Sequence, residues 1–203
     1  MHSLFLAFAD GIAWTGDVRA DMSALLTRHG QPKTVGHCLD VAAEARHLAH
    51  AYGVDEARAE LAGWLHDISA IIPPSRRLRA AVQLDLAVLP EESAVPTILH
   101  QKLSAAIARE LFGIADEPTL SAIGCHTTLK ANASTLDKVV FLADKLRWDQ
   151  AGDPPYLAAL RTACGQSLDR GAACYLDYLW QQRSRLPVVH PWFVEAYHQL
   201  KSE

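Results

Sequence analysis

Residues with metal-ligating side chains recur along the first three quarters of the chain. In order, they are His37, His66, Asp67, His100, His126 and Asp144. Imidazole nitrogens and carboxylate oxygens together suit iron, manganese, zinc and similar divalent ions. Such an ion lowers the pKa of a bound water and shields phosphate charge, so this set of residues predicts hydrolysis of a phosphoanhydride or phosphate ester.

The dipeptide His66-Asp67 is weak evidence by itself, because a chain with ten histidines is expected to contain such a pair by chance. Its context is more informative. The pair follows the apolar helical segment 61–65, where a carboxylate is partly buried and needs a partner. The alternative is that each polar residue of the set is an ordinary core residue satisfied by hydrogen bonds. Six such groups on five helices are costly to bury unless they share a partner, which favours a metal ion.

The elements that must position these residues all read as helices. Apolar residues recur with a period of 3.6, and strict alternation of the strand type is rare, which predicts an all-α fold. Helices are predicted over residues 17–28, 34–52, 55–68, 75–86, 97–112, 116–126, 134–144, 156–164 and 168–185, with a last one beginning near 191. Asp55 is a predicted N-cap, Ser134 and Asp137 a predicted capping box, and Gly53 a predicted helix end. A loop is expected around Pro90 and Pro96, and a turn-rich connection over 149–155.

Composition narrows the class of protein. The chain has 203 residues, of which 50% are hydrophobic and 21% charged, so it is long and apolar enough for one folded domain. The net charge of −4 shows no basic excess that would hold nucleic acid, and no apolar run has the length of a membrane span. The four cysteines form no C-x-x-C pair, and the N-terminus lacks the features of a secretory signal. We therefore expect a cytoplasmic protein that binds neither nucleic acid nor membrane.

The spaced set of ligands resembles the HD-domain superfamily of metal-dependent phosphohydrolases, and its flanking motifs look like the YqeK branch. The motifs are VGH at 35–37, AELAGWLHD at 59–67, AIGCHTT at 122–128 and LDKVVFLAD at 136–144. The resemblance extends over about residues 30–200. It implies an HD-domain helical bundle, which we assign as a single domain over 21–203. Residues 1–20 are then an N-terminal extension to which the sequence assigns no role.

Members of the YqeK branch are symmetrical bis(5′-nucleosyl)-tetraphosphatases, which split diadenosine tetraphosphate into two ADP and bind iron. Carried over by position, the resemblance implies that the primary metal ligands are His37, His66, Asp67 and Asp144. It also implies that His100 and His126 line the phosphate side or hold a second metal, and that Thr127 contacts phosphate.

Catalytic roles follow from the chemistry of three of these side chains. Asp67 can ligate a metal and also orient the attacking water. His100 and His126 can donate to phosphate oxygens if they are protonated. Because a polyphosphate also needs cations, Lys145 and Arg147, directly after Asp144, are the predicted substrate-binding cations. Lys130 and Lys33 are further candidates.

Three departures from the branch flank the predicted phosphate site. The chain reads TTLKA after His126 instead of a Gly-Arg-containing loop, and KLRW after Asp144 instead of Tyr-Ile-Glu-Pro. The residue after His100 is Gln101 instead of a small residue. These changes leave open two alternatives: a phosphohydrolase for another nucleotide or a phosphodiester, and a nucleotide-binding sensor without turnover. Iron is the metal that the resemblance implies, with manganese or another divalent ion as the alternative. The number of metals, and whether the protein is a homodimer, stay open.

Overall fold

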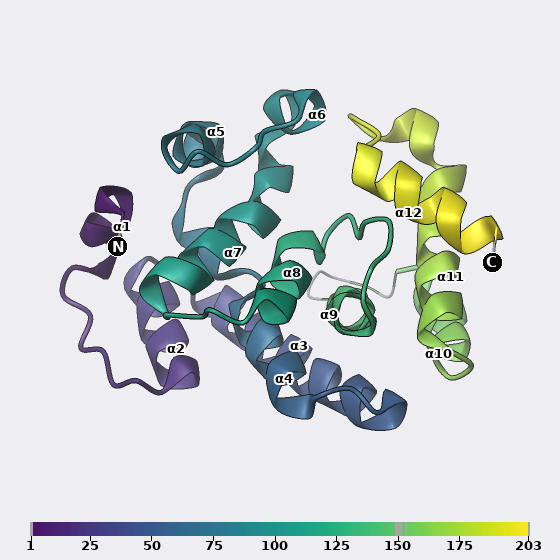
Figure 1. The fold of residues 1–203 in the computed structure, drawn as a ribbon, viewed down its shortest axis with the longest axis horizontal. Coiled ribbons are helices and arrows are strands. Elements are labelled where there is room, and N and C mark those ends of the chain that lie inside the picture. The colour runs from purple at the N-terminus through teal and green to yellow at the C-terminus, as the bar shows by residue number, and fades with distance from the viewer. Residues whose placement is uncertain (1, 149–151, 153, 203) are drawn as a thin grey trace.

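The computed structural model describes residues 2–148, 152 and 154–202, and all regular structure in this part of the chain is helical (Figure 1). The α-helices are α1 (Ser3–Ala9), α2 (Val18–Arg28), α3 (Pro32–Tyr52), α4 (Glu56–Leu65), α5 (Pro74–Gln83), α6 (Pro90–Ala94), α7 (His100–Leu111), α8 (Glu117–Cys125), α9 (Thr135–Leu146), α10 (Leu157–Cys164), α11 (Leu168–Gln181) and α12 (Pro191–Ser202). Short 3₁₀ helices cover Ile68–Ile71, Pro96–Leu99 and Arg183–Arg185. The all-α prediction is confirmed.

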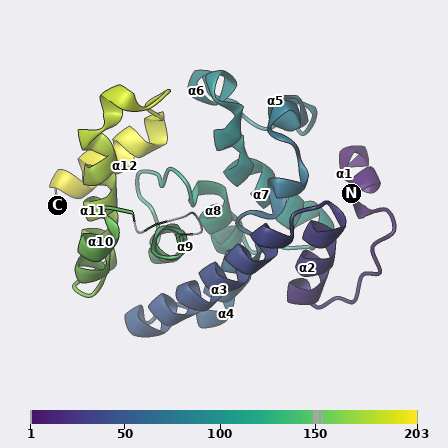
Figure 2. The same ribbon diagram turned by 180° about the vertical axis from the view of Figure 1, so that it is seen from behind.

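Helix α9 lies at the centre of the bundle and packs against α3, α4, α8 and α11. Most of its buried residues are apolar, and Val139, Val140 and Phe141 are fully buried. Helices α10 to α12 form one end of the molecule, and α1 and α2 lie at the other, as both ribbon views show (Figures 1 and 2). The central helix therefore packs against helices from both halves of the sequence, from α3 to α11.

The predicted helix boundaries with named caps are confirmed. The Asp55 carboxylate accepts a hydrogen bond from the Arg58 backbone N–H at 3.0 Å and begins α4. Ser134 and Asp137 exchange reciprocal bonds at 3.1 and 2.8 Å, which is a capping box at the start of α9. Gly53 ends α3 in the left-handed conformation, with φ of +65°.

Several boundaries differ from the sequence prediction. The expected loop around Pro90 and Pro96 contains α6 and a 3₁₀ turn, and the helix expected over 55–68 ends at Leu65, before the His66-Asp67 pair. The helix expected over 168–185 ends at Gln181. Helices this short are marginal on their own and depend on tertiary packing, which local sequence does not report. The connection expected over 149–155 lies largely outside the described residues.

Residues 3–9, within the predicted N-terminal extension, form α1. This helix packs against α7, and its Phe5 is fully buried in the common core. Among the described residues, no helix combines the length and apolar character that crossing a membrane requires.

Helices α3 and α4 approach each other closely at Gly63. A Cβ built on Gly63 would lie 2.5 Å from Ala42 Cα and 2.8 Å from Ala42 N. These are backbone atoms that no rotamer change can move away. Gly63 therefore sets the distance between the two helices that carry His37 and His66.

We expect Gly63→Ala to destabilise the fold by about 1–3 kcal/mol, because overpacking forces α3 and α4 apart. The control is Gly36→Ala on α3, where a Cβ meets nothing within 4 Å. That substitution should stabilise the protein by up to about 1 kcal/mol through helix propensity. Thermal unfolding of both variants measures the difference, and equal melting temperatures would contradict the close-packing argument.

Candidate metal centre

Three of the four site histidines lie where one helix ends or the next begins, and each is held in the same way. The Nδ1 atoms of His66, His126 and His100 contact the carbonyl oxygen of the residue three positions earlier, at 2.8, 2.8 and 2.7 Å. Since a carbonyl only accepts, Nδ1 carries the proton in each case. Nε2 of a neutral ring is then left with a free lone pair. Local helix geometry thus fixes both the tautomer and the direction of three rings.

The Asp67 carboxylate lies between two pairs of histidines. Its Oδ2 atom is 3.7 Å from His66 Nε2 and 4.0 Å from His37 Nε2. Its Oδ1 atom is 3.6 Å from His100 Nε2 and 3.7 Å from His126 Nε2. Two donor groups therefore share one carboxylate, each compact enough to hold a metal ion.

Asp144 of α9 completes the first of these groups. Its Oδ1 atom lies 3.1 Å from His37 Nε2 and 3.7 Å from His66 Nε2. With it, all six residues selected from the sequence come together at one place. They arrive from α3, the α4 and α8 termini, the start of α7 and α9.

The Nε2 atoms face one another in a way that calls for a cation between them. His37 Nε2 lies 3.2 Å from His66 Nε2, and His100 Nε2 lies 3.1 Å from His126 Nε2. The neutral His100 and His126 rings present lone pairs to each other at this distance, so they repel unless a proton or metal ion is shared. In addition, His37 Nδ1 is buried without a hydrogen-bond partner in the described part of the chain. Nitrogen and oxygen donors that converge in this way fit a divalent metal ion.

Electrostatics point in the same direction. Burial alone would raise the pKa of Asp67, but the neighbouring imidazoles, His66 foremost, lower it to about 2. Burial likewise opposes protonation of His66, yet Asp67 and Asp144 raise its pKa well above the usual range. The carboxylates thus favour positive charge at the centre of the cluster, and both remain ionised at neutral pH.

Burial and the neighbouring imidazoles hold the pKa of His126 well below its ordinary value. Burial also lowers the pKa of His100, against the opposing effect of Asp67. Both rings are therefore neutral near pH 7, with Nε2 as an acceptor, which favours metal ligation over proton donation.

Thr127 lies beside the second histidine pair, as predicted from the sequence. Its hydroxyl is 2.8 Å from His100 Nε2. Gln101, one of the departures from the family pattern, holds this loop: its Oε1 atom accepts bonds from the backbone N–H groups of Thr127 and Thr128 at 3.1 and 3.3 Å. The buried amide of Gln101 therefore positions the segment after His126.

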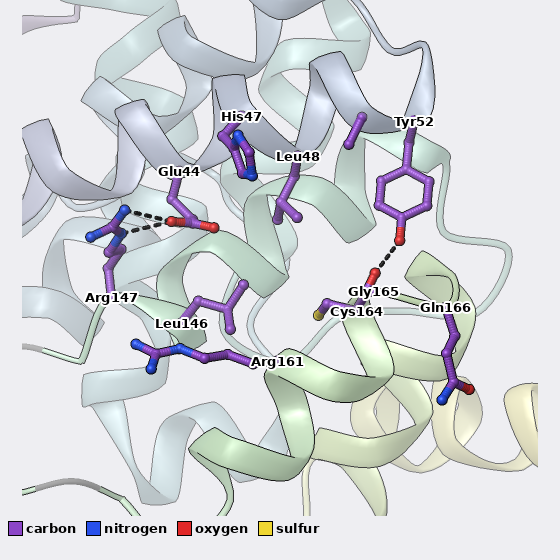
Figure 3. Close-up of a pocket in the computed structure, with 11 residues that line it drawn as sticks. Glu44, His47, Leu48, Tyr52, Leu146, Arg147, Arg161, Cys164, Gly165 and Gln166 are labelled. Atoms are coloured by element: carbon purple, nitrogen blue, oxygen red, sulfur yellow. Dashed lines mark hydrogen bonds and ion pairs between the residues drawn. The ribbon is translucent and has the colours of Figure 1, made fainter.

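The two predicted substrate-binding cations have carboxylate partners within the chain. Lys145 lies 2.5 Å from Asp144 Oδ2 and is nearly buried. Arg147 forms an ion pair with Glu44 of α3 at 2.6 Å. Figure 3 shows Arg147 turned toward Glu44, on the wall of a groove of about 570 Å³ that contains none of the six cluster residues. Arg147 also lines a second cavity, of about 850 Å³, together with His37 and Lys33.

Lys130, a candidate cation from the sequence, lies away from the cluster, whereas Arg77, which was not a candidate, lies beside it. Lys130 pairs with Ser121 and Asp137 and lines a different groove from the cluster. Arg77 of α5, which the sequence analysis did not select, shares a cavity of about 320 Å³ with Asp67, His100 and Thr127. The available signal was the group of arginines 76, 77 and 79, on a helix that starts shortly after the His66-Asp67 pair.

The described helices gather four histidines and two aspartates around one point, and this donor set fits a divalent metal ion. The family model described as HD domain matches residues 34–149, which is more than half of the chain and includes all six cluster residues. The chain belongs to the HD-domain family.

Two proteins have sequences that are similar to this chain. A protein of Lactococcus lactis subsp. cremoris, described as an uncharacterized protein in the pepC 5′ region, is 42% identical over 74% of this chain and 76% of its own length. A symmetrical bis(5′-nucleosyl)-tetraphosphatase of Halalkalibacterium halodurans is 37% identical over 59% of this chain. That match spans only 61% of the tetraphosphatase.

A solved structure confirms the fold. A crystal structure from Clostridium acetobutylicum, described as a predicted HD superfamily hydrolase involved in NAD metabolism, matches with a TM-score of 0.83 and 26% identity. The match covers 93% of this chain and 98% of that chain. The resemblance to HD-domain phosphohydrolases seen in the sequence is therefore confirmed in both sequence and structure.

We expect Asp67→Ala to abolish hydrolysis and to reduce the metal content of the purified protein, because its carboxylate serves both donor groups. His47→Ala is the matched control, since His47 lies exposed on α3 and outside the cluster. Elemental analysis of both proteins after reconstitution with Mn²⁺ or Fe²⁺ measures the difference. Equal metal content in the two variants would rule out the assignment.

Proposed function

We propose that this protein hydrolyses dinucleoside polyphosphates, and diadenosine tetraphosphate in particular, to two molecules of ADP. Water oxygen attacks one of the two central phosphorus atoms. The bridging oxygen leaves with the other half of the molecule, and the proton of the attacking water passes to solvent. The observation that carries the proposal is the shared Asp67 carboxylate between two histidine pairs, in a chain similar to a named symmetrical tetraphosphatase.

The metal-binding residues in this proposal fall into two groups. The first consists of His37, His66, Asp67 and Asp144. The second consists of Asp67, His100 and His126. A divalent ion, when bound, lowers the pKa of water and neutralises phosphate charge. Iron is our first candidate and manganese the second, because mixed nitrogen and oxygen donors accept both.

The chain's own side chains orient the reaction. Asp67, ionised and central, is placed to orient the attacking water. His100 and His126 are fixed by their Nδ1 bonds, so each Nε2 is an acceptor that can hold a metal ion on the phosphate side. Thr127, held by Gln101, can turn its hydroxyl from His100 to a phosphate oxygen. Each group is therefore in place before the substrate arrives, which reduces the reorganisation needed for reaction.

The surroundings of the cluster suit a substrate that extends in two directions. His37 lines the 850 Å³ cavity with the cations Lys33 and Arg147. Asp67 and His100 line the 320 Å³ cavity with Arg77. A tetraphosphate that is cut at its centre carries one nucleoside arm on each side, so cavities reached from both histidine groups support symmetrical cleavage. Lys145, paired with Asp144, adds positive charge near the scissile bond.

A second candidate is hydrolysis of another nucleotide. The segment 127–131 and the sequence after Asp144 depart from the YqeK branch near the cavities, and the Clostridium structure is described as involved in NAD metabolism. The same residues would hold the metal, and only the groups attached to the cleaved phosphate would differ.

The reaction products distinguish these possibilities. Metal-loaded protein is incubated with diadenosine tetraphosphate, and the products are separated by chromatography. We expect ADP as the sole nucleotide product. ATP together with AMP would exclude symmetrical cleavage, and untouched substrate beside turnover in a panel of other nucleotides would favour the second candidate. Nucleotide binding with no turnover of any substrate would identify a sensor.

A further inference from the structure

The cavity on the His100 side of the cluster is lined by Arg77, a cation that is not one of the six cluster residues. Its walls include Asp67, Ala70, Arg77, Ile98, His100 and Thr127. Arg77 comes from the first turn of α5, a helix that contributes none of the six cluster residues. The cavity therefore joins the metal centre to a separate source of positive charge.

Two backbone carbonyls hold the Arg77 guanidinium in place. Its Nε atom donates to the Ile72 carbonyl at 3.3 Å, and its Nη1 atom donates to the Thr97 carbonyl at 3.1 Å. These carbonyls belong to two different segments beside the cavity. The side chain is half-buried and pinned at two points, so it loses little further freedom when it binds a ligand.

Three cations near the site are paired with carboxylates, whereas Arg77 has only the longer-range attraction of Asp67, on the wall of the same cavity. Lys145 pairs with Asp144, Arg147 with Glu44, and Lys130 with Asp137. No ion pair of Arg77 occurs among the residues that the structure describes, and its two bonds go to neutral carbonyls. A half-buried guanidinium with unused N–H groups is a binding site for an anion.

A phosphate group is the anion that fits this position. The planar guanidinium matches two oxygens of a phosphate, and Arg is suited to such bidentate binding. The Thr127 hydroxyl on the same cavity wall adds a second donor. We propose that Arg77 and Thr127 form a subsite for a phosphate group of the substrate chain, next to the scissile bond on the His100 side. This subsite rests on the proposed function, because it assumes a substrate with more than one phosphate.

The test compares Arg77→Gln with Arg76→Gln, its exposed neighbour on the same helix. Both substitutions remove one positive charge from α5, and glutamine can still donate a hydrogen bond to a backbone carbonyl. The binding of ADP to each purified protein is measured by calorimetry, and kcat and KM for diadenosine tetraphosphate are measured separately. Thermal unfolding verifies that each variant is folded.

We expect Arg77→Gln to weaken ADP binding and to lower kcat/KM by about 10- to 100-fold, which corresponds to the loss of a charged hydrogen-bonded contact. Arg76→Gln should change either quantity by less than about twofold. If Arg77→Gln fails to fold, Arg77→Lys takes its place. Arg77→Lys keeps the charge but not the planar fork, so we expect a loss of about fivefold or more.

A folded Arg77→Gln that binds ADP like the unsubstituted protein overturns the subsite, as does a loss of the same size in Arg76→Gln. Failure of the proposed function looks different. In that case the unsubstituted, metal-loaded protein leaves diadenosine tetraphosphate intact, while ADP binding still depends on Arg77. If the unsubstituted protein does not bind ADP at all, the subsite is wrong.

Discussion

Four imidazoles and two carboxylates are packed around a single point, and their burial is the main constraint on how the surrounding helices are arranged. Two pairs of Nε2 atoms face each other at little more than 3 Å, and the Asp67 and Asp144 carboxylates remain ionised beside them. Isolated groups of this kind are costly to remove from water. A divalent cation bound at this point would be ligated by the same side chains and would offset the cost of burying them.

Three of the site histidines are oriented by the same local hydrogen bond. His66, His100 and His126 each use Nδ1 to bind the carbonyl three residues earlier, which aims Nε2 inward. His37 differs, because it lies within α3. The position of its ring relative to His66 depends on the distance between α3 and α4. That distance is set by the contact of Gly63 with the Ala42 backbone. A backbone contact between two helices thus controls the spacing of the first ligand pair.

The chemistry around the centre depends on how the cations are paired. Lys145 and Arg147 form ion pairs with Asp144 and Glu44, whereas the hydrogen bonds of Arg77 go to neutral carbonyls and Asp67 attracts it only from across the cavity. Charge that is already neutralised within the chain attracts a phosphate less strongly than charge that is not. The subsite proposed for Arg77 is consequently on α5, outside the motifs that characterise the family.

The sequence by itself determined the all-α fold and most helix positions, and its resemblance to HD-domain proteins predicted the six residues that the fold brings together. The fold could be predicted because helical periodicity and caps such as Asp55 are local properties, whereas the cluster residues, from His37 to Asp144, were connected by the resemblance to a known family. Helices α1 and α6, the role of Gln101 and the importance of Arg77 were decided only by tertiary structure. Short helices are stabilised by packing against distant residues. Whether a cation has a carboxylate partner likewise depends on contacts between segments far apart in the chain, as the pairing of Arg147 with Glu44 shows. No local pattern contains that information.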